Sequence, residues 1–260
     1  MRLQTHGPLV GVCNICGNTA KLTIDHIPPQ GCPRVGQAYL MNIMELIGIR
    51  PERRSQRFFQ NGINYRSICS VCNTILLGTE YDPELISFSH HLKAKIESRL
   101  FLPIEITTKL NGVVRSVVGH LIAHGIDLHR KGVGFELLTD YFLDPDAHWP
   151  TELKLYCWPY PSNDQIVIRT AGYVSVKSGV PNSTFTAIKF FPVAFLITPD
   201  EPPRSLFSHS RIDSLLTGII DEEILVTLPI SNIPPIRWPE APDEFGMILH
   251  TEHSFGARRI

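Results

Sequence analysis

Two Cys-x-x-Cys pairs constrain the fold of this chain more than any other feature of its sequence. The pairs are Cys13 with Cys16 and Cys69 with Cys72, which together are four of the six cysteines in 260 residues. Two thiolates at this spacing can bind one edge of a metal ion, and Gly17 permits the tight turn that follows the first pair. Two such pairs complete a tetrahedral four-sulfur site, the closed geometry of a structural metal ion. We therefore expect Zn2+ to link these two segments.

The metal interpretation depends on a reducing environment. The segment that follows Arg2 lacks the apolar stretch of a signal peptide, and no apolar run in the chain is long enough to span a bilayer. We therefore expect a cytoplasmic protein without a membrane partner. In that compartment, paired cysteines indicate metal ligands rather than disulfides.

An Asp-His pair lies between the two cysteine pairs. Residues 20–27 alternate polar and apolar side chains, which is the pattern of a β-strand, and Pro28-Pro29 ends it. Asp25 and His26 therefore lie at the end of a predicted strand. A histidine in such a hairpin is either a structural residue or part of a catalytic site, and its neighbours in sequence decide between the two.

The order of these motifs resembles the HNH endonuclease family over roughly residues 10–100. The chain reads Cys13-x-x-Cys16, Asp25-His26-Ile27-Pro28, Asn64 and Cys69-x-x-Cys72-Asn73. It is most similar to a bacterial branch with an Asp-His-(Ile/Val)-Pro-Pro signature and a Cys-Asn ending. The resemblance implies a ββα-metal fold and metal-dependent hydrolysis of phosphodiester bonds.

The resemblance also implies a role for each polar residue. His26 would be the general base that deprotonates water, because the pKa of histidine lies near neutral pH. Asp25 and Asn73 would bind one Mg2+ or Mn2+ ion, which prefers oxygen ligands. Asn64 would orient the base, with Asn61 as the alternative. Two features differ from the family. No Lys follows shortly after Asn73, and the segment between Pro29 and Asn61 is longer than in the minimal motif.

Charge is distributed unevenly along the chain. The net charge is −1, but residues 1–110 hold 12 Lys and Arg against 8 Asp and Glu, whereas the remainder holds 12 against 17. Four arginines follow the predicted strand in sequence: Arg50, Arg53, Arg54 and Arg57. They form either a solvated basic face or a clamp for phosphate, which the planar guanidinium can bind with two hydrogen bonds. We expect the bound nucleic acid to be DNA, with RNA as the alternative.

The remaining patterns predict an α+β protein. We expect a small zinc-stapled ββα-metal module followed by helices and a mainly antiparallel C-terminal β region, with domains at 1–105 and 106–260. The second domain ends in a Pro-rich tail and has no assigned role beyond possible docking of a partner protein. Helices are predicted at 37–49, 83–100 (with Asp82 as N-cap), 112–123 and 210–218, and strands at 153–158, 165–170, 173–177 and 184–198.

Two histidines lie four residues apart on one predicted helix. His120 and His124 can share a face, but the segment lacks the Glu of a metalloprotease helix, so we do not expect a metal there.

The sequence leaves two functions open. One is an HNH endonuclease that cuts DNA, in a process such as phage defence or restriction. The alternative is a catalytically silent zinc-stapled module that binds nucleic acid or docks on a partner. Asp25, His26 and Asn73 together favour the enzyme, because a scaffold needs only the cysteines.

Overall fold

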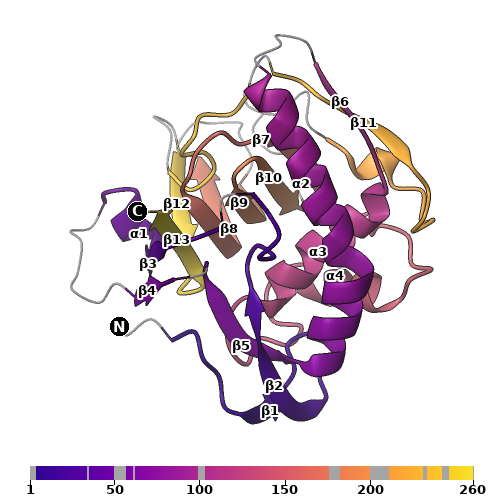
Figure 1. Ribbon diagram of the computed structural model, residues 1–260. Helices are drawn as coiled ribbons and strands as arrows, with labels where there is room; N and C mark the ends of the chain where they lie inside the picture. The colour runs from indigo at the N-terminus through magenta and orange to yellow at the C-terminus, as the bar shows by residue number, and fades with distance from the viewer. Residues whose placement is uncertain are drawn as a thin grey trace.

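Strands from both ends of the chain meet in one large antiparallel sheet (Figure 1). The computed structural model describes residues 4–33, 35–49, 57–60, 62–98, 103–175, 182–199, 211–230, 233–241 and 246–259. The order of the strands in the large sheet is β4 (Arg57–Phe59), β3 (Ala38–Asn42), β13 (Ser254–Arg259), β8 (Gln165–Ser175), β9 (Ser183–Phe190), β10 (Val193–Thr198) and β7 (Lys154–Pro159), and β12 (Gly246–His250) also pairs with β8.

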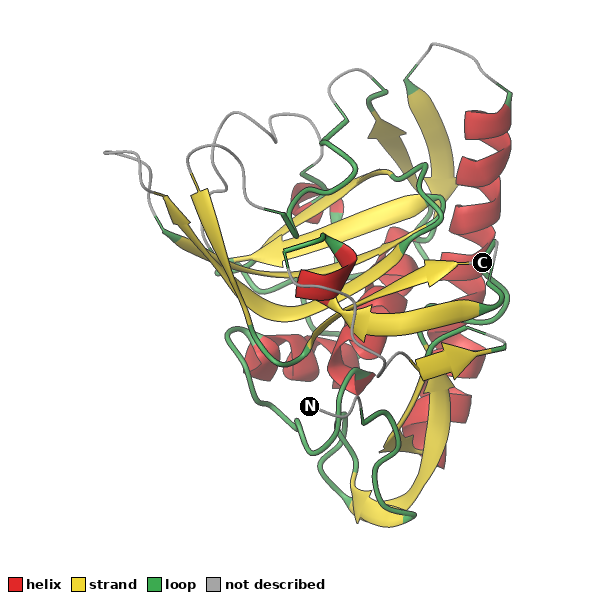
Figure 2. Cartoon of the chain, turned by 90° about the vertical axis from the view of Figure 1, so that its left-hand side faces the viewer, coloured by secondary structure: helices red, strands yellow, loops and turns green. Residues whose placement is uncertain are grey.

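The two faces of this sheet are covered by different elements. Ile166 and Ile168 of β8 pack in one apolar cluster with Ile43 and Leu46, whereas Val167 between them packs in the larger cluster with helix α3. This alternation follows from the two-residue period of a strand. Figure 2 shows a short helix on the near side of the sheet and longer helices behind it. The predicted α+β class with mainly antiparallel strands is confirmed.

The prediction of a helix over residues 37–49 is wrong. Residues Ala38–Asn42 form β3, and only Ile43–Leu46 form a helix, α1. Strand β3 pairs with β13 on one side and β4 on the other. The side chain of Asn42 accepts a hydrogen bond from the N–H of Met44 and starts the helix there. The apolar run is compatible with a helix and with a strand, and pairing with β13 and β4 makes its first part a strand.

A second sheet carries the cysteine pairs and the Asp-His pair. It contains β1 (Val10–Val12), β2 (Thr19–His26) and β5 (Asn64–Cys69), in the order β1-β2-β5. In the register of β2 and β5, His26 lies opposite Asn64 and Asp25 lies opposite Tyr65. Because successive side chains alternate between faces, Asp25 and Tyr65 are buried whereas His26 and Asn64 are only half-buried.

One long helical segment begins directly after this sheet. Residues Val71–Tyr81 form a π-helix, η1, that continues into the α-helix α2 (Asp82–Glu97). Asp82 therefore lies inside a helical segment, and the prediction that it caps a helix is wrong. Its carboxylate instead accepts hydrogen bonds from Ser116 and His120.

Helix α3 (Leu110–Ala123) crosses the centre of the molecule and is buried along its whole length. It confirms the helix predicted at 112–123. Helix α4 (Phe135–Leu143) packs beside it. At the end of α3, the guanidinium of Arg169 donates to five backbone carbonyls, those of Leu121, Ile122, His124, Leu128 and Lys131. Three of these carbonyls, those of Leu121, Ile122 and His124, lie at the end of the helix, where carbonyl groups lack partners within the helix.

The other strand and helix predictions are met in part. The range 165–177 is a single strand as far as Ser175, and the range 184–198 is two strands, β9 and β10. In the described part of 210–218, only Asp213–Leu215 is helical, as a 3-10 turn, η2. Asp213 accepts from the N–H of Leu155, so this segment follows β7 instead of forming a longer helix. Strands β6 (Ile104–Thr108) and β11 (Ile224–Leu228) form a separate pair.

The division at about residue 105 stays a prediction. Strands β3 and β4, from the first part, share a sheet with strands of the second part, and one apolar cluster includes residues of both. Within the described residues, no helix combines the length and the apolar character needed to cross a membrane.

The buried ring of His124 makes stability depend on pH. Its Nε2–H donates to the carbonyl of His253 at 2.9 Å, and burial lowers its pKa to about 3. The folded state therefore binds this proton less readily than the unfolded chain, whose histidine pKa is about 6.5. The contribution of His124 to stability is present above pH 6.5 and is lost as the pH falls toward 3.

We expect His124→Gln to remove part of this pH dependence, because its amide can donate to the same carbonyl and does not titrate. Between pH 6.5 and 4, the free energy of unfolding of wild type should fall more steeply than that of the variant, by up to about 1.4 kcal/mol per pH unit. Urea denaturation across this range measures both slopes. Parallel slopes would show that the ring is not kept neutral by the fold.

Candidate metal centre and adjoining polar site

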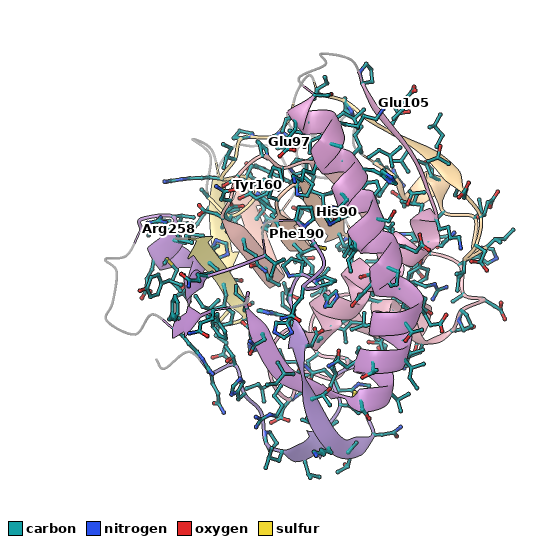
Figure 3. The ribbon with its side chains drawn as sticks, in the orientation of Figure 1. His90, Glu97, Glu105, Tyr160, Phe190 and Arg258 are labelled. Atoms are coloured by element: carbon teal, nitrogen blue, oxygen red, sulfur yellow. The ribbon has the colours of Figure 1, made fainter. Side chains whose placement is uncertain are left out.

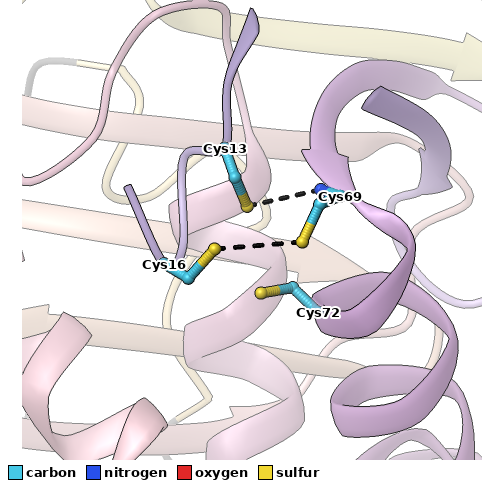
Figure 4. Close-up of side chains that lie close together, drawn as sticks. All are labelled: Cys13, Cys16, Cys69 and Cys72. Atoms are coloured by element: carbon cyan, nitrogen blue, oxygen red, sulfur yellow. Dashed lines mark hydrogen bonds between the residues drawn. The ribbon is translucent and has the colours of Figure 1, made fainter. Parts of the chain in front are cut away.

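The four cysteines of the two pairs come together at one end of the small sheet (Figure 4). Cys13 and Cys16 lie in the turn after β1, Cys69 ends β5, and Cys72 lies in η1. Their sulfur atoms all lie within 4.8 Å of one another. The Sγ atoms of Cys16 and Cys69 are 3.8 Å apart, which matches the separation of about 3.8 Å expected in a tetrahedral site with Zn–S bonds of about 2.3 Å. The cluster could hold a metal ion such as zinc.

Hydrogen bonds to sulfur favour a thiolate in this cluster. The Cys72 thiol and the backbone N–H of Cys69, 3.3 Å from the Cys13 sulfur, together lower the pKa of Cys13 to about 4. The pKa of Cys72 is raised, chiefly because its proton is shared with Cys13. A thiolate is the form that ligates a metal. The fold therefore brings together four sulfur atoms, and the surroundings of one already favour its charged form.

Asp25 is part of a buried polar chain that joins three elements. Its Oδ2 accepts from Nδ1 of His120 at 3.0 Å, and Nε2 of the same ring donates to Oδ1 of Asp82 at 3.0 Å. Ser116, one turn before His120 on α3, donates to the same oxygen of Asp82 at 2.7 Å. The side chains of Asp25 and His120 are 4% and 1% exposed. We name these four residues the Asp25–Ser116 chain.

The surroundings of His120 favour the protonated form of its ring. Burial alone would lower its pKa, but the carboxylates of Asp25 and Asp82 raise it to about 10. Both ring nitrogens then carry a proton, as donation to two carboxylates requires. Burial raises the pKa of Asp25, and His120 opposes that effect. His120 thus has both nitrogens occupied and is not placed to ligate a metal.

The side-chain amide of Asn73 is fixed in one orientation. Its nitrogen lies 2.9 Å from both Thr23 Oγ1 and the carbonyl oxygen of Ile24. The Ile24 carbonyl can only accept, and the Thr23 hydroxyl gives its single proton to the carbonyl of Ile68. Both partners therefore require N–H groups, which defines the amide orientation. Within the described residues, no hydrogen bond engages the amide oxygen, which lies beside the strand segment that precedes Asp25.

His26 is half-buried at the end of β2, directly after Asp25. The amide nitrogen of Gln30 is 3.3 Å from Nε2 of His26, and since an amide nitrogen only donates, Nε2 is the acceptor. Burial lowers the pKa of His26 below its ordinary value, against the effect of the neighbouring Asp25. His26 therefore presents an unprotonated nitrogen at a position that solvent reaches.

The loop that carries Gln30 is attached to helix α2. His90, labelled in Figure 3, donates through Nε2 to the carbonyl of Gly31 at 3.0 Å. Cys32 lies 3.9 Å from the hydroxyl of Ser89 on the same helix. These contacts fix the loop that lies beside His26.

Asn64 and Arg57 lie on the same outer face as His26. Oδ1 of Asn64 lies 3.4 Å from Nε2 of His6, and the guanidinium of Arg57 lies 3.4 Å from the ring nitrogens of His6. Arg57 also stacks over Phe59. The described residues thus bring Arg57, Asn64 and His26 to one face. The other predicted site residues of this group, Arg50, Arg53 and Arg54, and the alternative Asn61, lie outside the described residues.

Sequence reasoning missed the residues that surround Asp25. For His120 only a metal role was considered and not expected, Asp82 was assigned to a cap, and His6 and Gln30 were not considered. The spacing of His120 and His124 did not indicate this network, because its hydrogen bonds join residues 25, 82 and 120, which are distant in sequence. Comparison with known proteins gives no match: neither a family model, nor a curated protein, nor a solved structure is significantly similar to this chain.

Proposed function

We propose that this protein is a metal-dependent endonuclease of the HNH type that hydrolyses phosphodiester bonds in DNA, with zinc bound by the four cysteines. The observation that carries the proposal is the orientation of Asn73. Its amide is fixed against Thr23 and Ile24, which leaves its oxygen without a hydrogen bond from the described residues, beside the strand that carries Asp25. The antiparallel pair β2–β5, followed by the helical segment from residue 71, agrees with a ββα arrangement.

The donor atoms fit a hard divalent cation. Asp25 uses Oδ2 for His120, and no hydrogen bond from a described residue engages its other oxygen. A carboxylate oxygen and an amide oxygen are ligands that Mg2+ and Mn2+ prefer, with water completing the shell. When bound, such an ion neutralises charge that develops on the phosphate oxygens. We infer that Asp25 and Asn73 hold it.

The chain's own residues supply the other parts of the reaction. His26 accepts a proton from the attacking water at Nε2, where that water replaces the amide of Gln30. Arg57 lies on the same face and can donate to a phosphate oxygen. Asn64 lies opposite His26 in the strand pair and is the group that orients His26, the proposed base.

Incubation of the purified full-length protein with plasmid DNA, single-stranded DNA and RNA tests this function. We expect cleavage of DNA with Mg2+ or Mn2+ and none with EDTA. The alternative, a silent binding or docking module, is favoured if every substrate stays intact with both ions while the protein is folded and zinc-loaded. Cleavage of RNA alone would correct the substrate class.

Phosphate binding by Arg57 can be measured separately from cleavage. We expect Arg57→Ala to weaken DNA binding and to reduce the slope of log affinity against log salt by about 0.9 if one phosphate contact is lost. Fluorescence anisotropy with a labelled duplex, without added Mg2+, gives the slope. Lys93→Ala is the matched control, since Lys93 carries the same charge on α2, where it pairs with Glu97. Equal slopes for the two variants would identify Arg57 as a residue of a solvated basic face.

A further inference from the structure

The Asp25–Ser116 chain places ionisable side chains in contact inside the protein, where packing alone does not require them. Asp25 and Asp82 each face one nitrogen of His120, so two carboxyl groups share one imidazole ring. The side chains of Asp25 and His120 are almost fully buried. Replacing buried ionic groups with apolar side chains often costs no stability, so stability alone does not account for this arrangement. The divalent cation proposed at Asp25 would give this arrangement a role.

The geometry of the chain determines which oxygen of Asp25 faces that cation. His120 engages Oδ2. Asp82 in turn fixes the imidazole by accepting from its other nitrogen. Ser116 donates to the same oxygen of Asp82 and holds that carboxylate in place. The carboxylate of Asp25 is thus restrained by a ring on α3 that is itself restrained by α2. Residues that orient a metal-ligating carboxylate act through such hydrogen bonds.

We propose that His120 is a positioning residue that fixes the carboxylate of Asp25, so that its second oxygen faces the divalent cation bound with Asn73. This inference rests on the proposed function, because it assumes a cation at Asp25. It adds a role for a residue outside the proposed ligand set, on a helix that lies beyond the segment resembling the HNH family.

Two substitutions of His120 separate positioning from packing. The amide nitrogen of Asn matches the place of Nδ1 in a histidine, whereas that of Gln matches Nε2. His120→Asn therefore keeps the donor to Asp25 and loses the contact with Asp82, and His120→Gln does the reverse. Both remove the same charge from the same buried position. His124→Gln is the matched control, because it lies one turn further along and bonds to His253 instead.

The readout is Mn2+ affinity of the full-length, zinc-loaded protein, measured from the electron paramagnetic resonance signal of free Mn2+. We expect His120→Gln to weaken Mn2+ binding by about 10-fold to 100-fold, the usual effect of losing a group that orients a metal ligand. His120→Asn and His124→Gln should stay close to wild type. Urea denaturation of all variants shows whether affinity follows stability.

Several outcomes overturn the inference. Equal Mn2+ affinity in His120→Asn and His120→Gln, whether both are normal or both are weak, would show that His120 acts only through packing. If either variant is unfolded, Ser116→Ala provides the comparison, because it loosens Asp82 without a change of charge; unchanged Mn2+ affinity in that variant contradicts positioning. If wild type binds no Mn2+, or binds it as tightly as Asp25→Asn does, there is no cation site at Asp25. The proposed function then fails as well.

Discussion

His26→Ala is expected to lower the rate of DNA cleavage by a factor of about 10² to 10⁴, the usual contribution of a positioned general base. His26 is half-buried on the outer face of β2, and its Nε2 accepts from Gln30 rather than from a core residue. Its removal should therefore leave the fold and the zinc content unchanged. Single-turnover cleavage of plasmid DNA with saturating Mg2+ measures the rate.

His91→Ala is the control for this experiment, because His91 is an exposed histidine on α2, outside the proposed site. It should cut at the wild-type rate. Full activity in His26→Ala would place the chemistry on other residues. Zinc content and thermal unfolding of the variant, compared with those of wild type, distinguish loss of a base from loss of structure.

Local patterns predicted the parts of the structure that depend on neighbours in sequence. The alternation of residues 20–27 predicted β2, and the apolar segment at 112–123 predicted α3. The spacing of the cysteines predicted that they meet, since a metal site needs two pairs and the chain has two. Each of these signals lies within a short segment, and tertiary contacts did not reverse it.

Pairing between distant segments was not predictable in this way. The apolar run at 37–49 fits a helix, but its first residues pair with Ser254–Arg259 at the other end of the chain. The backbone hydrogen bonds of that pairing outweigh a weak helical preference. No pattern within the run itself indicates its partner.

The polar site was predicted as single residues and not as an arrangement. Asp25, His26, Asn64 and Asn73 were named from motifs, and the structure places them on one strand pair and the helix that follows it. The contacts that define Asp25, with His120 and through it with Asp82, depend on the packing of α2 against α3. Whether these residues catalyse a reaction stays a prediction.

Replacing Cys69 and Cys72 together with serine is expected to remove the bound zinc and to unfold at least the first sheet. Wild type should contain about one zinc ion per chain by elemental analysis or native mass spectrometry, and the double variant close to none. Binding of a structural zinc ion contributes about 10–16 kcal/mol in small zinc-binding peptides, whereas a whole domain is stable by only about 5–15 kcal/mol. Loss of the metal therefore removes an energy comparable to that of folding.

The effect should extend to the proposed cation site, because Asn73 follows Cys72 directly in η1 and donates to the carbonyl of Ile24 in β2. Mn2+ affinity is then expected to fall along with zinc content. Cys157→Ala is the control: Cys157 is buried in β7, outside the four-cysteine cluster, so zinc content should not change. Zinc retained at the wild-type level in the double variant would place the metal elsewhere. A chain that loses zinc yet keeps its stability and Mn2+ affinity would show that packing of α3 against β2 and β5 is sufficient to organise the site without the metal.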